Sequence, residues 1–154
     1  MGTEDEPILV FDEAVAVTLR EMAGIEVAPR DRREVTGGEF AGVSALLQLR
    51  NGGVGYLVLS CSQSVAKELA RRVFAESQAE LDAGMIRDCV GEVANVIAGQ
   101  AKTLLFGTPH HYTLSPPAFD IKGPPDPDIK RWVLTFASEI GEFIVQVRLP
   151  TASG

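Results

Sequence analysis

Two polar side chains with the spacing of helical neighbours give the clearest indication of chemistry in this sequence. Glu92 and Asn95 are three residues apart within the stretch from Asp88 to Lys102. Residues at this spacing lie side by side on a helix, so a carboxylate and a carboxamide would project together. Gly99 follows one turn later on the same face, and its lack of a side chain would let another surface come close. This arrangement suits a site that must reach into the active site of another molecule.

The alternative for these residues is the solvated face of an ordinary amphipathic helix, and two details weaken it. An exposed helical carboxylate is usually stabilised by a basic residue three or four positions later. Glu92 has Asn95 and Val96 at those positions, and the like-charged Asp88 lies four positions before it. Asn is also a mediocre helix former. The pair contributes little to helix stability, and local rules broken without structural gain suggest a function.

Other kinds of chemistry find less support in the sequence. His110 and His111 are adjacent in a proline-bounded connection, which favours a turn over a metal site. The motifs of serine hydrolases, HExxH metalloproteases and CxxC proteins are absent. Asp88 and Glu92 could share a metal, but the rest of their face completes no ligand set, so we expect no metal site in this chain.

Bulk composition restricts the class of protein. The chain has 154 residues, a net charge of −7 and 45% hydrophobic residues, so we expect a single domain over residues 1–154. The acidic balance argues against nucleic acid as a partner, because phosphate contacts need a basic patch. No apolar run approaches the roughly 20 residues of a membrane span, and the acidic N-terminus is unlike a signal peptide. We therefore predict a cytoplasmic protein in which Cys61 and Cys89 are small buried hydrophobic side chains.

Periodicity and turn residues predict the elements that precede the polar pair. Helical spacing covers residues 8–23, and residues 28–38 are charged and turn-like. Strands are expected over residues 40–49 and 55–61, joined by Asn51-Gly52-Gly53, whose residues accept the positive φ of a tight turn. A further helix should begin at Ser62 or Ser64, either of which can cap it, and end near residue 75.

The polar pair itself falls on a predicted long helix from residue 79 to about 106. Its apolar stripe comprises Ile86, Val90, Val93, Ile97, Ala101 and Leu104. The opposite sector holds Asp88, Glu92, Asn95, Gly99 and Lys102. After it we expect a strand over residues 111–115, irregular loop through 127, and a closing hairpin of residues 132–138 and 143–149 joined at Gly141. The order α-β-β-α-α-β-β-β predicts an α+β fold, with helices on one face of a largely antiparallel sheet.

Residues 91–102, read as GEVANVIAGQAK, resemble the signature helix of the CheC/CheX chemotaxis phosphatases. That signature has Glu-x-x-Asn, a hydrophobic pair, a small residue, Gly, a polar residue, Ala and Lys. Gln100 departs from it, since Asn is commoner there. Residues 114–117 also resemble the strand-and-proline segment that follows the family's motif helix. A single Glu-x-x-Asn pair resembles the one-site CheX branch more than the two-site CheC branch.

The resemblance implies hydrolysis of the aspartyl phosphate on a response-regulator receiver domain of the CheY type. In that reading Asn95 positions the attacking water, and Glu92 docks onto the receiver's lysine. Asp88, Gly99 and Lys102 would face the partner. The resemblance implies no cofactor bound by this chain, with Mg²⁺ supplied by the receiver.

The resemblance also implies a homodimer built through the sheet, for which the apolar C-terminal hairpin could present an unpaired edge. The alternative is a non-catalytic signalling module that binds a receiver or a copy of itself.

Overall fold

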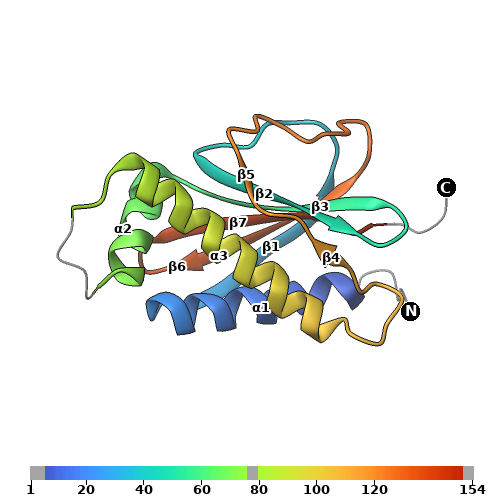
Figure 1. Cartoon of the computed structure of the whole chain (residues 1–154), viewed down its shortest axis with the longest axis horizontal. Helices are drawn as coiled ribbons and strands as arrows, with labels where there is room; N and C mark the ends of the chain where they lie inside the picture. The colour runs from blue at the N-terminus through green and yellow to red at the C-terminus, as the bar shows by residue number, and fades with distance from the viewer. Residues whose placement is uncertain (1–5, 76–79, 151–154) are drawn as a thin grey trace.

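Within residues 6–75 and 80–150, which the computed structural model describes, three helices cover one face of a seven-stranded sheet (Figure 1). The elements are α1 (Glu6–Ala23), β1 (Val27–Val35), β2 (Val43–Arg50), β3 (Val54–Cys61), α2 (Gln63–Val73), α3 (Ala83–Leu104), β4 (Thr113–Leu114), β5 (Ala118–Phe119), β6 (Arg131–Ser138) and β7 (Gly141–Arg148). All strand pairings are antiparallel. The predicted α+β class, with the helices on one face, is confirmed.

The strand order β1-β6-β7-β3-β2-β4 places the C-terminal hairpin in the middle of the sheet. β6 pairs with β1, β7 pairs with β3, and the short β5 pairs with β2 beside β4. The expectation that this hairpin presents an unpaired edge is therefore wrong. The long strand at an edge of the described sheet is β1.

The interpretation of residues 28–38 as turn-like is also wrong, because most of this stretch belongs to β1. It pairs with β6 from Val27, opposite Ser138, to Val35, opposite Arg131. Nearly all of its side chains are exposed, as expected for an edge strand. The sequence of β1 therefore lacks the alternation of apolar and polar residues by which a strand is predicted. The ladder with β6 and the ion pair between Arg32 and Asp12 of α1, at 3.5 Å, hold the strand in place.

Polar side chains cap the starts of α2 and α3, and the cap of α2 was predicted. Ser62 caps α2 by accepting a hydrogen bond from the Val65 N–H at 3.2 Å. Asp82 caps α3 in the same way, with 2.8 Å to the Met85 N–H. Residue 79, where this helix was predicted to start, lies outside the described residues. Residues 80–82 are described and are not helical, so the predicted start is too early. Strand β4 is shorter than predicted, and β5 falls inside the stretch predicted as loop.

The main core lies between the helices and the sheet. Val90, Val93 and Ile97 of α3 are fully buried, as the apolar stripe predicts, whereas Leu104 at the end of the predicted stripe is exposed. Cys61 and Cys89 are free and buried in the same core, which confirms their interpretation as small hydrophobic side chains. Burial raises the pKa of the Cys61 thiol to about 12.

A smaller cluster of Phe40, Leu46, Tyr56 and Val58 lies apart from this core, with Ile121 packed against it. Alternation along β3 turns Tyr56 and Val58 away from the helices. The Phe40 N–H donates to the Lys122 carbonyl at 2.8 Å, which joins the loop before β2 to the one after β5.

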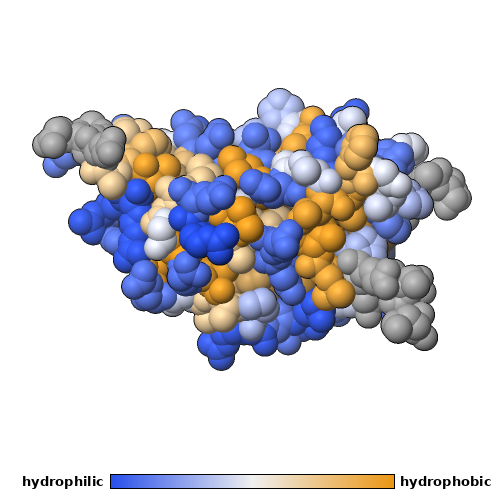
Figure 2. All heavy atoms as spheres, turned by 90° about the horizontal axis from the view of Figure 1, so that it is seen from below, coloured by the Kyte–Doolittle hydropathy of each residue, from blue (hydrophilic) through white to orange (hydrophobic). Residues whose placement is uncertain are grey.

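Seen from the α1 side, the surface is largely hydrophilic with separate hydrophobic areas (Figure 2). Large exposed hydrophobic side chains include Leu9 of α1 and Phe106 just after α3. None of the helices within the described residues has the length and hydropathy needed to cross a membrane.

Candidate functional site

Helix α3 presents the two residues of the polar pair on its outer side. Glu92 is exposed and Asn95 is half-buried, while Val93 and Ile97 are fully buried against the core. The opposed faces predicted from helical spacing are therefore confirmed. The helix runs across the front of the molecule (Figure 1). The exposure of Glu92 and the partial exposure of Asn95 leave this outer face accessible to a partner.

The side chains of Glu92 and Asn95 make no hydrogen bond or ion pair with any other residue that the structure describes. A carboxylate and a carboxamide left unengaged keep all their donors and acceptors for an external group. Polar residues on a helix surface can stabilise the helix by pairing with residues three or four positions away, and neither Glu92 nor Asn95 does so within the described residues. The pair is thus chemically available and held at a fixed spacing.

The remaining predicted contact residues lie around the pair. Gly99 is half-buried, and a Cβ placed on it would meet no atom within 4 Å, so the space over it is open as expected. Asp88 is exposed and pairs with Arg87, with 3.4 Å between Oδ1 and Nη2. Lys102 is half-buried in the last turn of α3.

Packing on both sides of α3 fixes the position of this face. Tyr112 is buried, and its hydroxyl donates to the Ala98 carbonyl at 2.7 Å, tying the chain after α3 back onto the helix. The Asn51 side chain donates to the Pro109 carbonyl at 3.0 Å and anchors the same connection to the β2–β3 turn. α1 packs along the other flank of α3.

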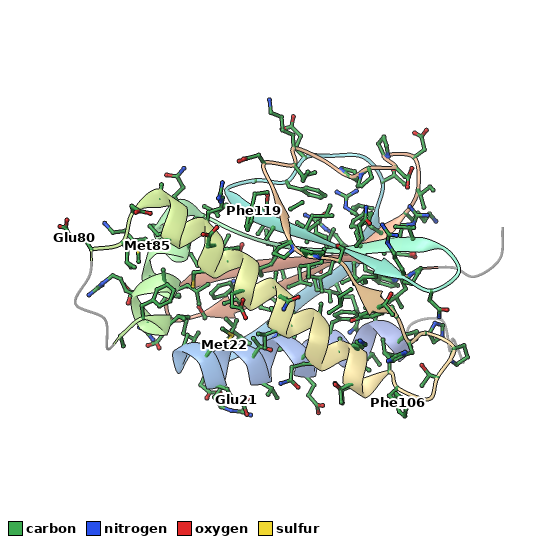
Figure 3. All side chains as sticks on the ribbon, in the orientation of Figure 1. Glu21, Met22, Glu80, Met85, Phe106 and Phe119 are labelled. Carbon is green, nitrogen blue, oxygen red and sulfur yellow. The ribbon has the colours of Figure 1, made fainter. Side chains whose placement is uncertain are left out.

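Gly91 is a site residue whose role the sequence did not reveal. A Cβ on Gly91 would lie 2.6 Å from the Phe119 ring and 3.4 Å from Pro117, so any larger residue at this point would force the Phe119 ring to move. Figure 3 shows Phe119 between β5 and α3. Gly91 is four residues before Asn95 and therefore its neighbour on the helix surface. The proline-containing segment thus borders the Asn95 face directly.

Candidate metal ligands do not gather at this site. Within the described residues no group of three or more His, Cys, Asp or Glu side chains could hold a metal ion. Burial, together with the charge of Glu92, raises the pKa of Cys89 to about 11.

Solved structures of chemotaxis proteins share this fold. A chemotaxis protein from Desulfovibrio vulgaris Hildenborough is 23% identical, with a TM-score of 0.82, over 93% of this chain and 96% of that chain. The chemotaxis protein CheX from Desulfovibrio desulfuricans is 22% identical, with a TM-score of 0.80, over 94% and 99%. A chain of the CheX–CheY–BeF₃–Mg²⁺ complex from Borrelia burgdorferi is 22% identical, with a TM-score of 0.70, over 94% and 97%.

Comparison with curated protein sequences gives no match. The family model described as chemotaxis phosphatase CheX matches residues 43–125. This span runs from the start of β2 past β5 and includes the whole of α3 with its Glu92 and Asn95 face. By this match and by its fold, the chain belongs to the CheX family of chemotaxis phosphatases.

Proposed function

We propose that this chain, as a single phosphatase domain over residues 1–154, hydrolyses the aspartyl phosphate of a CheY-type receiver domain. The observation that carries the proposal is the unengaged Glu92 and Asn95 pair on the open face of α3, in a chain of the CheX family. A relative with the same fold forms a complex with CheY, BeF₃ and Mg²⁺. We propose a cytoplasmic location, in line with the two free, buried cysteines.

The proposed reaction needs little from this chain beyond placement of a water molecule. An acyl phosphate is already reactive, and the receiver's own Mg²⁺ offsets the phosphate charge. The water oxygen bonds to phosphorus as the bond between phosphorus and the aspartyl oxygen breaks. The products are the aspartate carboxylate and inorganic phosphate, which takes up the hydroxyl of the water. The remaining proton goes to phosphate or solvent.

Asn95 is proposed to hold this water in line with the breaking bond. A carboxamide has both a donor and an acceptor, so it can orient a water molecule while leaving a lone pair aimed at phosphorus. The absence of competing side-chain partners for Asn95 among the described residues supports this role. Half-burial on a packed helix limits its rotamers, which favours a fixed water position.

Glu92 is proposed to dock the receiver by accepting a charge-assisted hydrogen bond from the receiver's lysine. Its exposed position one turn before Asn95 would bring that lysine close to the attacking water. Gly99 would allow close approach of the receiver backbone, and Asp88 and Lys102 would contact the receiver at the margins of the same face.

We also propose that the chain is a homodimer that pairs through β1. This edge strand carries charges of both signs, Arg30-Asp31-Arg32-Arg33-Glu34. In a two-fold antiparallel register with Arg32 opposite its copy, Asp31 of each protomer faces Arg33 of the other. Opposite charges facing each other across strands are favourable, and Asp12 offsets the Arg32 charge within each protomer.

The phosphatase proposal is tested by measuring phosphate release from a panel of phosphorylated receiver domains with and without the full chain. Acceleration for at least one receiver is expected. Binding to receivers without acceleration of any of them would instead favour the non-catalytic signalling module. Neither binding nor acceleration across the panel would contradict the proposal.

A further inference from the structure

A cavity of about 620 Å³ opens beside the N-terminal half of α3. Three positively charged side chains from separate parts of the chain line it: Lys67 of α2, Arg87 of α3 and Lys122 after β5. Asp120 is the single acidic residue among the described residues that line it. The cavity is therefore locally positive, although the chain as a whole has a net charge of −7. Such a local excess of positive charge attracts anions.

The interior of this cavity is mainly apolar, with a few hydrogen-bonding groups. The apolar lining residues are Phe40, Val43, Ile86, Phe119 and Ile121. The polar ones are Ser44, Gln63 and Ser64. A volume of a few hundred Å³ with an apolar wall and a few convergent polar groups is typical of small-molecule sites.

Two of the three cations lack a counter-charge. Among the described residues, no carboxylate lies within 4.0 Å of Lys67 or Lys122. Both side chains are exposed at the rim, so an entering anion would meet them without having to break an existing ion pair. The chemistry therefore suits a ligand with an anionic head and an apolar body.

Arg87 connects this cavity to the Glu92 and Asn95 face. Its guanidinium lies 4.7 Å from the centre of the Phe119 ring and 3.4 Å from Asp88 Oδ1. Asp88 is four residues before Glu92, hence its neighbour on the helix. An anion in the cavity would compete with Asp88 for Arg87, and the released Asp88 would add negative charge beside Glu92.

We propose that this cavity binds a small organic anion with an apolar body, and that the bound anion strengthens receiver docking by drawing Arg87 away from Asp88. The binding site stands on the cavity alone, whereas the effect on docking rests on the proposed function.

The binding site is tested on the full chain with two fluorescent probes that share their rings, anionic 8-anilinonaphthalene-1-sulfonate and uncharged N-phenyl-1-naphthylamine. The sulfonate should bind about tenfold more tightly. Lys67→Gln and Lys122→Gln should each weaken sulfonate binding about threefold to fivefold, as for loss of one exposed charge pair, and leave the uncharged probe unaffected. Lys130→Gln, an exposed lysine outside the cavity, is the matched control and should bind as wild type.

Equal binding of the two probes, or unchanged sulfonate binding in the Lys67→Gln/Lys122→Gln double variant, would overturn the site. Near-UV circular dichroism of each variant checks that the fold is intact. Because this experiment involves no receiver, it shows whether the cavity binds anions even if the phosphatase proposal fails.

The coupling is tested by titrating a receiver with and without saturating sulfonate probe. The probe should raise receiver affinity about threefold. Arg87→Gln should bind the receiver about as tightly as the probe-saturated wild type, and the probe should add nothing further. An unchanged or lower receiver affinity in the presence of bound probe would overturn the coupling.

Discussion

Asn95 carries the chemical step in the proposed mechanism, so its truncation gives the sharpest test. Asn95→Ala should lower the maximal rate of receiver dephosphorylation about 100- to 1000-fold, as for the loss of other preorganised hydrogen bonds to reacting groups. Receiver affinity should stay near the wild-type value, because docking is assigned to Glu92. Single-turnover phosphate release at several receiver concentrations separates the two quantities. A wild-type maximal rate would remove Asn95 from the mechanism.

Glu92 should give the opposite pattern. Glu92→Ala should raise the receiver concentration needed for half-maximal rate by about tenfold or more, because hydrogen bonds to charged groups contribute roughly 1.5–3 kcal/mol. The maximal rate should change much less. Glu21→Ala, at an exposed carboxylate of α1, is the control and should behave as wild type. If Glu92→Ala and the control needed the same receiver concentration for half-maximal rate, Glu92 would have no role in docking the receiver.

The buried cysteines make stability depend on pH above neutrality. Burial raises the pKa of Cys61 to about 12, and burial together with the Glu92 charge raises that of Cys89 to about 11. Unfolded thiols ionise near pH 8.5, so the folded state binds more protons above that pH. The free energy of unfolding should be highest below about pH 8.5 and fall as pH rises toward 11 and 12.

Denaturant unfolding at pH 7.5 and pH 10 measures this fall. In a Cys61→Ala/Cys89→Ala double variant the fall should be smaller. An equal fall in the wild type and the double variant would assign the pH dependence to other groups.

Two glycines of α3 have opposite surroundings, although both lie on one helix. Gly91→Ala should destabilise the fold by about 1–3 kcal/mol, because its Cβ would overlap the Phe119 ring and force a repacking. Gly99→Ala should stabilise the fold by up to about 1 kcal/mol, since the space there is open and Ala is the better helix former. Thermal or denaturant unfolding of the two variants checks both signs.

Receiver binding gives a second test of the open space at Gly99. Gly99→Ala should weaken receiver binding despite its greater stability, because the added methyl group occupies the surface proposed to approach the receiver. A stabilised Gly99→Ala variant with unchanged receiver affinity would show that the receiver does not come close at this point.

The strong periodicity of its apolar residues explains why α3, and which of its sides is buried, could be predicted from the sequence. An apolar stripe of several turns leaves one orientation against the core, so the positions of Glu92 and Asn95 followed directly. The hairpin of β2 and β3 was predictable for a similar reason, since Gly52 in the turn has the positive φ, +73°, that its residue type allows.

Features that depend on distant parts of the chain escaped prediction. β1 is held mainly by backbone bonds to β6, about a hundred residues away, and its charged side chains give no alternation. The two-residue β5 is too short for any pattern, and the fit of Phe119 onto Gly91 joins residues 28 positions apart. Tertiary contact, rather than local preference, specifies these elements.

At the scale of the whole molecule, the exposed edge at β1 predicts the assembly. Light scattering at micromolar concentration should give a dimer mass. Asp31→Arg should produce monomers, because it places like charges opposite each other, and the swap Asp31→Arg/Arg33→Asp should restore the dimer. A monomeric wild type, or a dimer insensitive to Asp31→Arg, would contradict pairing through β1.

The central place of the β6–β7 hairpin has a consequence for synthesis. A nascent chain that has not yet emerged beyond residue 130 contains β1 and β3 but neither of the strands that join them. β2 to β5 can pair with one another before this point, but the complete sheet forms only after translation has delivered residues 131–148, and loop closure over such separations slows folding. Until then the apolar face of α3 and the edge of β3 have no complete sheet to cover them. Chaperone binding to the ribosome-bound chain should therefore persist until that last hairpin is released.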